Sequence, residues 1–436
     1  MDSTRFNGKT FLMLGSNVLS KEMVVYAKSN GAYTIVADYY DPEKSEAKQV
    51  SDESVMISTA DMDALDQLII DKHVDAVFAG ISEFNLLKAM HLAQKHGLSF
   101  YCDSNQWEKI ERKDLFRKLC IKHSVPCPKT YYIGSDLNNQ QLRGFVYPLV
   151  VKPVDCCSSK GVFICNTESD LRKHWRISLN DSEYGKIIIE RFIRGDEFTA
   201  HYTIVNGRAS LSCIDNRYPV AVHEGHVTTI PVARVYPSTF IGSYVTKVNH
   251  AMISLCEDLG LTNGVVFIQG LHNAETDDFA IFEAGLRSAG EAPNRIIEVI
   301  NGINYMKLLI DDCLASHETT FEQEKEDPYM GGKCCGVISF IGKHGKVGEI
   351  IGLEKAVKDT PSVINYECRY PVGSVVPDTD TLRQIMIRFV MICDDRNQMA
   401  RDIAYLNDHI TVLNDLGEDM VIKCDPQRIH TEFMEA

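Results

Sequence analysis

The sequence predicts a protein of mixed α/β and α+β class, divided into about three structural units. The chain has 436 residues, of which 44% are hydrophobic, and this is enough for several cores. From Lys9 to about Asn105, short apolar runs alternate with helical segments, which indicates a parallel sheet with right-handed crossovers. Later apolar runs come in pairs joined by short polar turns, which is typical of strand hairpins.

The N-terminal region is expected to begin with a buried strand, Thr10–Leu14, a tight turn and a helix, Ser20–Ser29. Further strands are expected at Tyr33–Ala37, Ser54–Ile57, Ala76–Ala79 and Leu98–Cys102. The turn Gly15-Ser16-Asn17 is not the G-x-G-x-x-G fingerprint, so dinucleotide binding is not favoured. Glu83 follows a predicted strand end, where open α/β sheets bind ligands. Substrate contact and helix capping are both open roles for it.

A charged amphipathic helical stretch is expected from Asn105 to Ser124. It ends at Val125-Pro126-Cys127-Pro128, because proline disfavours helical conformation in the residue before it. Lys113 lies on this stretch and, taken alone, would be a solvated helix lysine.

Lys152 lies inside the apolar run Tyr147–Val154, which is predicted to be a strand. A lysine buried among Leu, Val and Pro is costly without an anion, and a nucleotide phosphate would be such a partner. The turn that follows offers hydroxyls, backbone N–H groups and one more charge, and such a loop can fold over phosphates. Its candidate residues are Ser158, Ser159, Lys160 and Gly161. The alternative is an ordinary hairpin with a lysine that reaches out to solvent.

Two glutamates frame the next candidate motif. A buried strand ends at Glu190, the chain continues through Arg191, Phe192 and Ile193, and Glu197 begins the following strand. Two further strands, Gly264–Gly270 and Phe279–Arg287, are joined by the polar turn His272–Asp278. Gln269 and Glu283 are expected to face each other on these strands as oxygen ligands for Mg²⁺.

At these motifs the chain resembles the ATP-grasp superfamily of carboxylate-amine ligases, which includes carbamoyl phosphate synthetase large chains and L-amino acid ligases. The resemblance implies an ATP-grasp fold that binds ATP and Mg²⁺ (or Mn²⁺). It implies that Lys113 and Lys152 bind nucleotide phosphates, Arg191–Ile193 contact adenine, and Glu197 holds the ribose. Gln269 and Glu283 would bind metal, and Arg287 would reach the transferred phosphate, with Arg287 and Lys152 as the catalytic pair.

The resemblance also implies the domain order. Residues 1–105 would form a Rossmann-like pre-ATP-grasp domain, residues 106–327 the ATP-grasp domain with a lid at about 128–193, and residues 328–436 a small C-terminal α+β domain. In the last region, short strands are expected at Gly336–Gly342 and Lys346–Leu353, then a helix from Thr379 to about Cys393 and a long helix from Asp395 to Asp415.

Three positions depart from the common family pattern. Gln269 stands where many members have an acid, although carbamoyl phosphate synthetases carry glutamine there. Gly285 stands where an asparagine that binds the second metal is usual, and Cys156-Cys157 replace typical glycines in the phosphate loop. These departures leave open whether the chain turns ATP over.

An irregular segment rich in turn residues is expected from Asn216 to Pro231, and such loops often carry an acceptor site. His223, His226 and Arg234 are candidates for substrate contact or proton transfer, with polar surface as the alternative for the two histidines. Further candidates to line the acceptor pocket are Glu291, Asn294 and Arg295.

Composition excludes some classes of function. The formal net charge is −15, and no cluster of Lys and Arg indicates nucleic-acid binding. The N-terminus lacks the apolar core of a signal peptide, and no apolar run reaches membrane-span length, so a cytoplasmic protein without membrane contact is expected. A homodimer is expected by analogy alone.

The leading hypothesis is an ATP-dependent ligase that activates a small-molecule carboxylate as an acyl phosphate and joins it to a small-molecule amine. One alternative is an enzyme that phosphorylates bicarbonate, as carbamoyl phosphate synthetases or biotin carboxylases do. The other is a regulator that binds ATP without turnover.

Overall fold

In the computed structural model, the residues described are 4–16, 19–156, 160–220, 230–379 and 381–431. The N-terminal sheet has the order β3-β2-β1-β4, and all its neighbouring strands are parallel. Its strands are β1 (Thr10–Leu14), β2 (Tyr33–Asp38), β3 (Glu53–Met56) and β4 (Ala76–Phe78). Its helices are α1 (Ser20–Ser29), α2 (Glu46–Val50), α3 (Met62–Lys72) and α4 (Glu83–His96). The predicted parallel α/β unit is therefore confirmed.

The expected strand at Leu98–Cys102 is wrong, because this segment pairs with no strand and runs as irregular chain after α4. Its apolar residues are buried by ring packing instead. Phe100 and Tyr101 stack with ring centroids 4.7 Å apart, and both pack against Phe78 of β4. The Tyr101 hydroxyl donates a hydrogen bond to the Leu286 carbonyl at 2.5 Å, which ties this segment to the centre of the molecule.

Two antiparallel sheets follow. The smaller sheet has the order β5-β8-β6-β7. Its elements are β5 (Thr130–Gly134), α7 (Asn139–Leu142), β6 (Leu149–Pro153), β7 (Phe163–Cys165), α8 (Glu168–Asp181) and β8 (Ile187–Arg191). The larger, central sheet has the order β10-β9-β13-β14. Its strands are β9 (Asp196–Val205), β10 (Arg208–Ile214), β13 (Gly264–Asn273) and β14 (Asp278–Gly285).

Seven helices accompany the central sheet in the described part of the chain. They are α5 (Ser104–Glu111), α6 (Lys113–Lys122), α9 (Ile241–Tyr244), a π-helical turn (Val245–Asn249), α10 (His250–Asp258), α11 (Asn294–Asn301) and α12 (Tyr305–Leu314). The stretch expected as one helix over 105–124 is thus two helices, broken at Arg112, whose backbone is extended. This break turns the next residue, Lys113, toward the smaller sheet.

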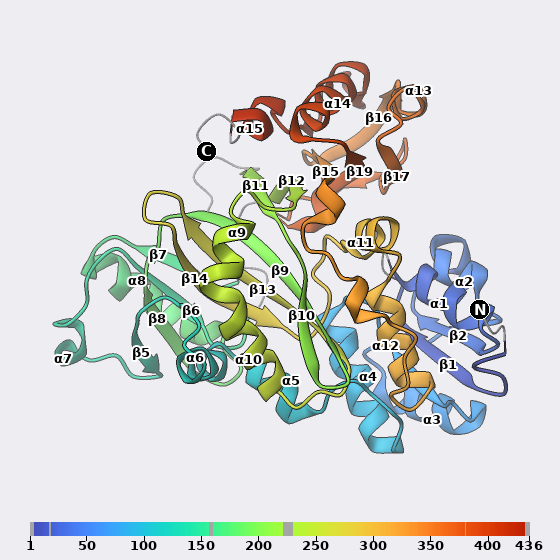
Figure 1. Ribbon diagram of the computed structural model, residues 1–436, viewed down its shortest axis with the longest axis horizontal. Helices are drawn as coiled ribbons and strands as arrows, with labels where there is room; N and C mark the ends of the chain where they lie inside the picture. Colours follow the sequence, from blue (N-terminus) through green and yellow to red (C-terminus); the bar gives the residue numbers. More distant parts are fainter. Residues whose placement is uncertain (1–3, 17–18, 157–159, 221–229, 380, 432–436) are drawn as a thin grey trace.

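The C-terminal sheet joins segments that are distant in sequence. Its order is β11-β12-β15-β19-β17, with β21 paired to β15, and Figure 1 shows β11 and β12 rising from the central region to meet it. The strands are β11 (Asn216–Val220), β12 (Ile230–Tyr236), β15 (Cys334–Gly342), β17 (Val363–Cys368), β19 (Ile385–Cys393) and β21 (Val421–Ile422). A second sheet consists of β16 (Gly345–Ile351), β18 (Val375–Val376) and β20 (Thr411–Asn414). The helices here are α13 (Leu353–Lys358), α14 (Arg396–His409) and α15 (Pro426–Thr431).

Three expectations in this region are wrong. The run expected as a helix from Thr379 to Cys393 contains the strand β19, because its apolar residues are enclosed between β15 and β17 rather than on one helix face. The long helix expected to reach Asp415 ends at His409 and is followed by β20. The segment expected to be irregular from Asn216 contributes the strands β11 and β12.

The hydrophobic cores correspond to these sheets. The N-terminal sheet and the central sheet share one large hydrophobic cluster, whereas the smaller sheet and the C-terminal sheets each have their own. Within the described residues, no helix combines the length and apolar character of a membrane span.

Candidate functional site

A buried group of charged side chains lies between the smaller sheet and α6. Lys152 on β6 donates to Glu190 Oε2 on β8 at 2.9 Å, and Arg117 Nε on α6 donates to Glu190 Oε1 at 2.7 Å. Lys152 is opposite Ile188 in the antiparallel ladder, so Glu190 is its diagonal neighbour on the same face. The three side chains are no more than 7% exposed. The buried lysine predicted to need an anion therefore has one in Glu190.

The electrostatics of this group follow from burial and pairing. Burial lowers the pKa of Lys152, and this outweighs the attraction of Glu190. For Glu190, burial alone would raise the pKa, but Lys152 and Arg117 outweigh it and hold the pKa below its usual range. Glu190 is thus a carboxylate that neutralises two cations, and a phosphate arriving here would share Lys152 with it.

Lys113 lies at the end of β6, where the predicted phosphate loop begins. Its backbone N–H donates to the Val154 carbonyl at 2.8 Å, and its ammonium donates to the Cys156 carbonyl at 2.6 Å. Ser158 and Ser159 lie outside the described residues. Beyond them, Lys160 is mostly exposed and lies 3.4 Å from Asp181 Oδ1. Gly161 has a positive φ of 69°, and an added Cβ would lie 2.8 Å from Pro153 Cγ, so only glycine fits this turn.

The segment expected to contact adenine is held by hydrogen bonds to neighbouring segments of the same chain. The Arg191 N–H donates to the Lys129 carbonyl at 2.9 Å and the Phe192 N–H to the Pro148 carbonyl at 3.1 Å, while Ile193 is half-buried. Glu197 lies at the start of β9 and is paired with Arg217 of β11. Adenine and ribose contacts for these residues remain predictions.

Gln269 on β13 and Glu283 on β14 are direct partners in the antiparallel ladder, so both side chains project from the same face. Both are half-buried. An amide oxygen and a carboxylate are hard donors that suit Mg²⁺, which usually takes further oxygens from phosphates and water. Among the described residues, no group of three or more His, Cys, Asp and Glu is arranged to hold a metal ion. The pair itself offers two oxygen donors of the kind that Mg²⁺ binds.

The buried group of Lys152, Glu190 and Arg117 lies next to the Gln269–Glu283 pair. Arg117 donates to the carbonyls of Ile281 and Phe282 on β14, at 2.9 and 3.3 Å. The Lys152 ammonium lies 5.7 Å from the centre of the Phe282 ring, one residue before Glu283.

The absence of a side chain at Gly285 has a steric explanation in this structure. A Cβ at this position would lie 2.3 Å from Phe267 Cε1 and 2.8 Å from Glu111 Oε1, which is closer than real Cβ contacts allow. Glu111, at the end of α5, accepts a hydrogen bond from the Leu286 N–H at 3.2 Å. Burial and the nearby Glu83 together raise the pKa of Glu111 to about 8, against the opposing effect of Arg287. A carboxyl group from another part of the chain thus occupies the space next to residue 285.

Arg287 connects the central sheet to the N-terminal unit. It donates to Glu83 Oε2 at 3.2 Å and to the Ser288 carbonyl at 3.2 Å, and its guanidinium lies 4.7 Å from the Phe267 ring centre. Its Nε has no hydrogen-bond partner. The acidic neighbours Glu111 and Glu83 outweigh burial and raise the pKa of Arg287.

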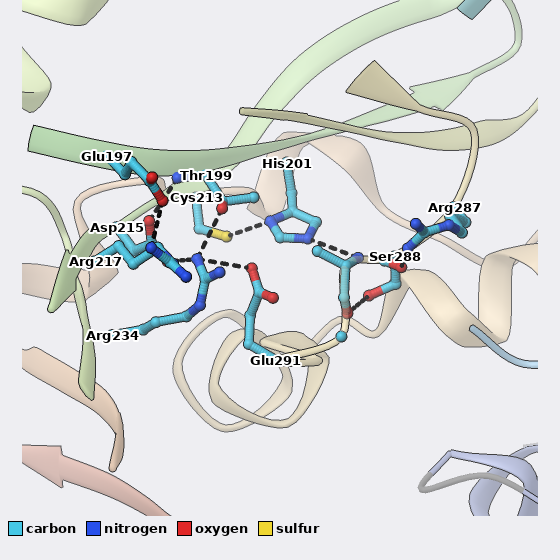
Figure 2. A network of polar contacts seen from close by, with 12 residues as sticks. Glu197, Thr199, His201, Cys213, Asp215, Arg217, Arg234, Arg287, Ser288 and Glu291 are labelled. Carbon is cyan, nitrogen blue, oxygen red and sulfur yellow. Dashed lines mark hydrogen bonds and ion pairs between the residues drawn. The ribbon is translucent and has the colours of Figure 1, made fainter. Parts of the chain in front are cut away.

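A second polar network continues from Arg287 into the molecule, and Figure 2 shows its members pointing toward one another. Arg234 of β12 donates to Asp215 Oδ2 at 2.6 Å and to Thr199 at 2.7 Å, and lies 3.3 Å from Glu291 Oε1. His201 Nε2 accepts a hydrogen bond from the Ala289 N–H at 3.2 Å. Burial lowers the pKa of His201 to about 4, so the ring is neutral with its proton on Nδ1. Neutral His201 therefore fixes the loop between Arg287 and Glu291.

The structure brings most candidate residues into one continuous region. The contacts described above join seven of them, which are Lys113, Lys152, Glu190, Gln269, Glu283, Arg287 and Glu83. Asn294, at the start of α11, is fully buried near Glu22, with its Oδ1 unpartnered. His223 and His226 lie outside the described residues. The sequence did not single out Arg117 and Glu111 as site residues. The one hint was that both lie on the same helical stretch as Lys113.

Comparison with known proteins is consistent with this geometry. Residues 145–294 match the family described as "ATP-grasp domain", and this range holds Lys152, Glu190, Glu283 and Arg287. The chain therefore contains an ATP-grasp domain, as the sequence motifs predicted.

Among relatives, the formate-dependent phosphoribosylglycinamide formyltransferase of Prochlorococcus marinus is 31% identical over 205 residues, which are 46% of this chain and 52% of that protein. The chain thus spans about half the length of the curated relatives it matches.

Two solved structures share the fold over nearly the whole chain. The L-amino acid ligase of Bacillus licheniformis has a TM-score of 0.73 and 17% identity, covering 94% of this chain and 99% of that one. The biotin carboxylase of Campylobacter jejuni has a TM-score of 0.74 and 14% identity, covering 98% of this chain and 95% of that one. The predicted ATP-grasp fold is confirmed.

Proposed function

We propose that the chain is an ATP-dependent ligase that activates a small-molecule carboxylate as an acyl phosphate and joins it to a small-molecule amine. The observation that carries the proposal is the convergence of buried cations, the Gln269–Glu283 pair and Arg287 in one region of an ATP-grasp domain. Phosphoryl transfer depends on such positioned positive charge, because the protein itself makes no covalent bond.

The proposed reaction has two steps. A carboxylate oxygen attacks the γ-phosphorus of ATP, the new O–P bond forms, and the bond to the β-phosphate oxygen breaks to release ADP. The amine then attacks the acyl carbon, the C–N bond forms, and the C–O bond breaks so that phosphate leaves with its electron pair, while the amine nitrogen gives up one proton to the departing phosphate. Mg²⁺ held by Gln269 and Glu283 would supply charge neutralisation at the phosphates.

The chain's own residues have distinct roles in this proposal. Lys113 and Lys152 bind the phosphates, and Glu190 holds Lys152 in place while no nucleotide is bound. Arg287 stabilises the negative charge on the transferred phosphoryl group, and its hydrogen bond to Glu83 orients the guanidinium. Arg191–Ile193 contact adenine and Glu197 the ribose.

A specific observation favours a second candidate, a regulator that binds ATP without turnover. Gly285 lacks a ligand side chain, and Phe267 and Glu111 fill the space that such a side chain would need. Phosphorylation of bicarbonate is a third candidate, supported by the likeness in fold to a biotin carboxylase.

The test is ADP release by the purified chain with ATP and Mg²⁺, across amino acids singly and in pairs, other small carboxylates and amines, and bicarbonate. Glu283→Ala is the inactivated variant. Glu275→Ala is the matched control, because Glu275 is exposed on the turn of the same hairpin. ADP release that needs two substrates and is lost only in Glu283→Ala supports the ligase. Release with bicarbonate alone supports the third candidate, and ATP binding in calorimetry without release supports the regulator. We further propose that the protein is a homodimer in the cytoplasm.

A further inference from the structure

Glu111 is a carboxylate in the candidate site that the proposed reaction does not use. It is half-buried at the end of α5, and its Oε1 accepts a hydrogen bond from the Leu286 N–H at 3.2 Å. Among the described residues, its other oxygen accepts no hydrogen bond. Glu111 therefore has one carboxylate oxygen that no other part of the described chain engages.

The Glu111 carboxylate lies on the face of the central sheet that carries the Gln269–Glu283 pair. In the ladder of β13 and β14, Gln269 is opposite Glu283, and the pairing continues without a bulge to Gly285. Residues 283 and 285 therefore project from the same face. A Cβ added at Gly285 would lie 2.8 Å from Glu111 Oε1. Glu111 thus occupies the position of a side chain at residue 285, next to Glu283.

The spacing along β14 allows Glu283 and Glu111 to bind the same ion. Side chains two residues apart on a strand start roughly 7 Å from each other. A glutamate places its carboxylate oxygens roughly 3.5 Å beyond its Cβ, so Glu283 reaches to roughly 3.5 Å from Glu111 Oε1. Two neighbouring oxygens bound to one octahedral Mg²⁺ at about 2.1 Å lie roughly 3 Å apart. The two carboxylates can therefore share a divalent cation without movement of the backbone.

Charge favours a cation at this point. In the part of the chain that the structure describes, neither Glu111 nor Glu283 has a cation within 4 Å, and the nearby Arg287 pairs with Glu83. Two neighbouring carboxylates repel each other when both are ionised. A divalent cation between them offsets both charges and removes this repulsion.

The break between α5 and α6 directs two charges to different sheets. Arg112 is extended, and the residues on either side of it diverge. Glu111 contacts the chain at the end of β14, whereas Lys113 donates to the Cys156 carbonyl at the start of the proposed phosphate loop. Since Lys113 is proposed to bind nucleotide phosphates, Glu111 lies where a cation that accompanies those phosphates would meet the central sheet.

We propose that Glu111 is a ligand of the divalent cation bound by Glu283, supplied from α5 at the position where residue 285 has no side chain. This role rests on the proposed function for the nucleotide that accompanies the cation, but cation binding itself does not depend on turnover. It also changes the meaning of Gly285, because the space beside this residue then holds a ligand instead of lacking one.

The alternative is a purely structural role, in which Glu111 only accepts the hydrogen bond from Leu286. A glutamine would accept that hydrogen bond equally well, but it would not supply the negative charge that strengthens binding of a divalent cation. Glu111→Gln therefore separates the two roles. This variant should not lower the unfolding temperature of the metal-free chain, because the acceptor for Leu286 is kept.

The experiment measures Mn²⁺ binding to the full chain from the electron paramagnetic resonance signal of the free ion, with a non-hydrolysable ATP analogue present. We expect Glu111→Gln to weaken Mn²⁺ binding by roughly 10-fold or more, since even changes behind a metal ligand cost about 10–100-fold. Glu108→Gln is the control on the same helix and should leave the affinity unchanged, because the Glu108 side chain is 44% exposed and lies three residues away. Glu83→Gln removes a nearby charge that is already paired with Arg287, so its effect should be smaller than that of Glu111→Gln.

Several results would overturn the proposal. These are equal Mn²⁺ affinity in the natural chain and Glu111→Gln, equal weakening by Glu83→Gln, or no Mn²⁺ binding by the natural chain. ADP release that needs two substrates, together with an Mn²⁺ affinity that does not depend on Glu111, would leave the ligase standing and refute this ligand. Mn²⁺ binding that depends on Glu111, without ADP release from any substrate pair, would support the ligand and refute the ligase.

Discussion

Replacing Glu190 by glutamine is the sharpest test of the buried cation group. The substitution keeps the shape and one acceptor oxygen, but it leaves Lys152 and Arg117 as buried cations with 7% and 2% exposure. Breaking a buried ion pair by removing one partner costs roughly 3–5 kcal/mol. We therefore expect the unfolding transition of the unit that contains Glu190 to fall by about 6–20 °C, from roughly 2–4 °C per kcal/mol.

The pH dependence gives this prediction a second readout. Because the pKa of Glu190 is lowered in the folded chain, its stabilising contribution is present above the unfolded pKa of about 4.5. That contribution is lost as pH falls through the folded pKa, so the difference between Glu190→Gln and the natural chain should shrink in acid. Glu168→Gln is the control, because its ion pair with Arg172 is about half exposed. Equal unfolding temperatures for the two variants at neutral pH would refute the reasoning.

Three further predictions concern the buried polar groups. Gly285→Asn should destabilise the chain by about 1–3 kcal/mol, because its Cβ overlaps Phe267 and Glu111; a denaturant midpoint equal to that of the natural chain would contradict this. For Glu111 the pKa is raised to about 8, so the folded chain binds more protons than the unfolded chain between about pH 4.5 and 8, and stability falls as pH rises through this range. Glu111→Gln should therefore be more stable than the natural chain at pH 9 and lose this pH dependence, as followed by thermal unfolding from pH 5 to 9. Glu326→Ala should cost about 1–3 kcal/mol in chemical denaturation, because it removes the buried carboxylate that accepts hydrogen bonds from the hydroxyls of Thr203, Ser210 and Ser212.

The sequence predicted the fold where local pattern and tertiary environment agree. Helix Ser20–Ser29 has one apolar face and a clear C-terminal signal in Asn30-Gly31, and its bounds match those of α1. The run Ile385–Cys393 is apolar on both faces, and such a run does not distinguish a buried helix from a strand enclosed on both sides. Leu98–Cys102 has strand composition, but its rings pack against Phe78 beyond the edge of the sheet.

The candidate site was predictable where one residue conflicts with its surroundings. Lys152 stands out as a charge in an apolar strand, and Gln269 and Glu283 stand out because hairpin pairing places them opposite each other. Arg117 gives no such signal, since a helix arginine is usually exposed; its role arises from contact with Glu190, 73 residues away. Glu111 is similar, because its importance depends on the missing side chain of Gly285.

Lys152 and Arg388 illustrate the same physical rule with different outcomes. Each is the lone cation in a buried apolar strand, and each should therefore have an anion near it. Lys152 has Glu190 at 2.9 Å within the chain, so a nucleotide phosphate must compete with or join an existing ion pair. Arg388 has no carboxylate partner among the described residues, and burial lowers its pKa to about 10 without removing its charge at neutral pH. Glu367 and Glu291 act on Arg388 only at longer range, so the same rule is met by a close ion pair on one strand and by more distant carboxylates on the other.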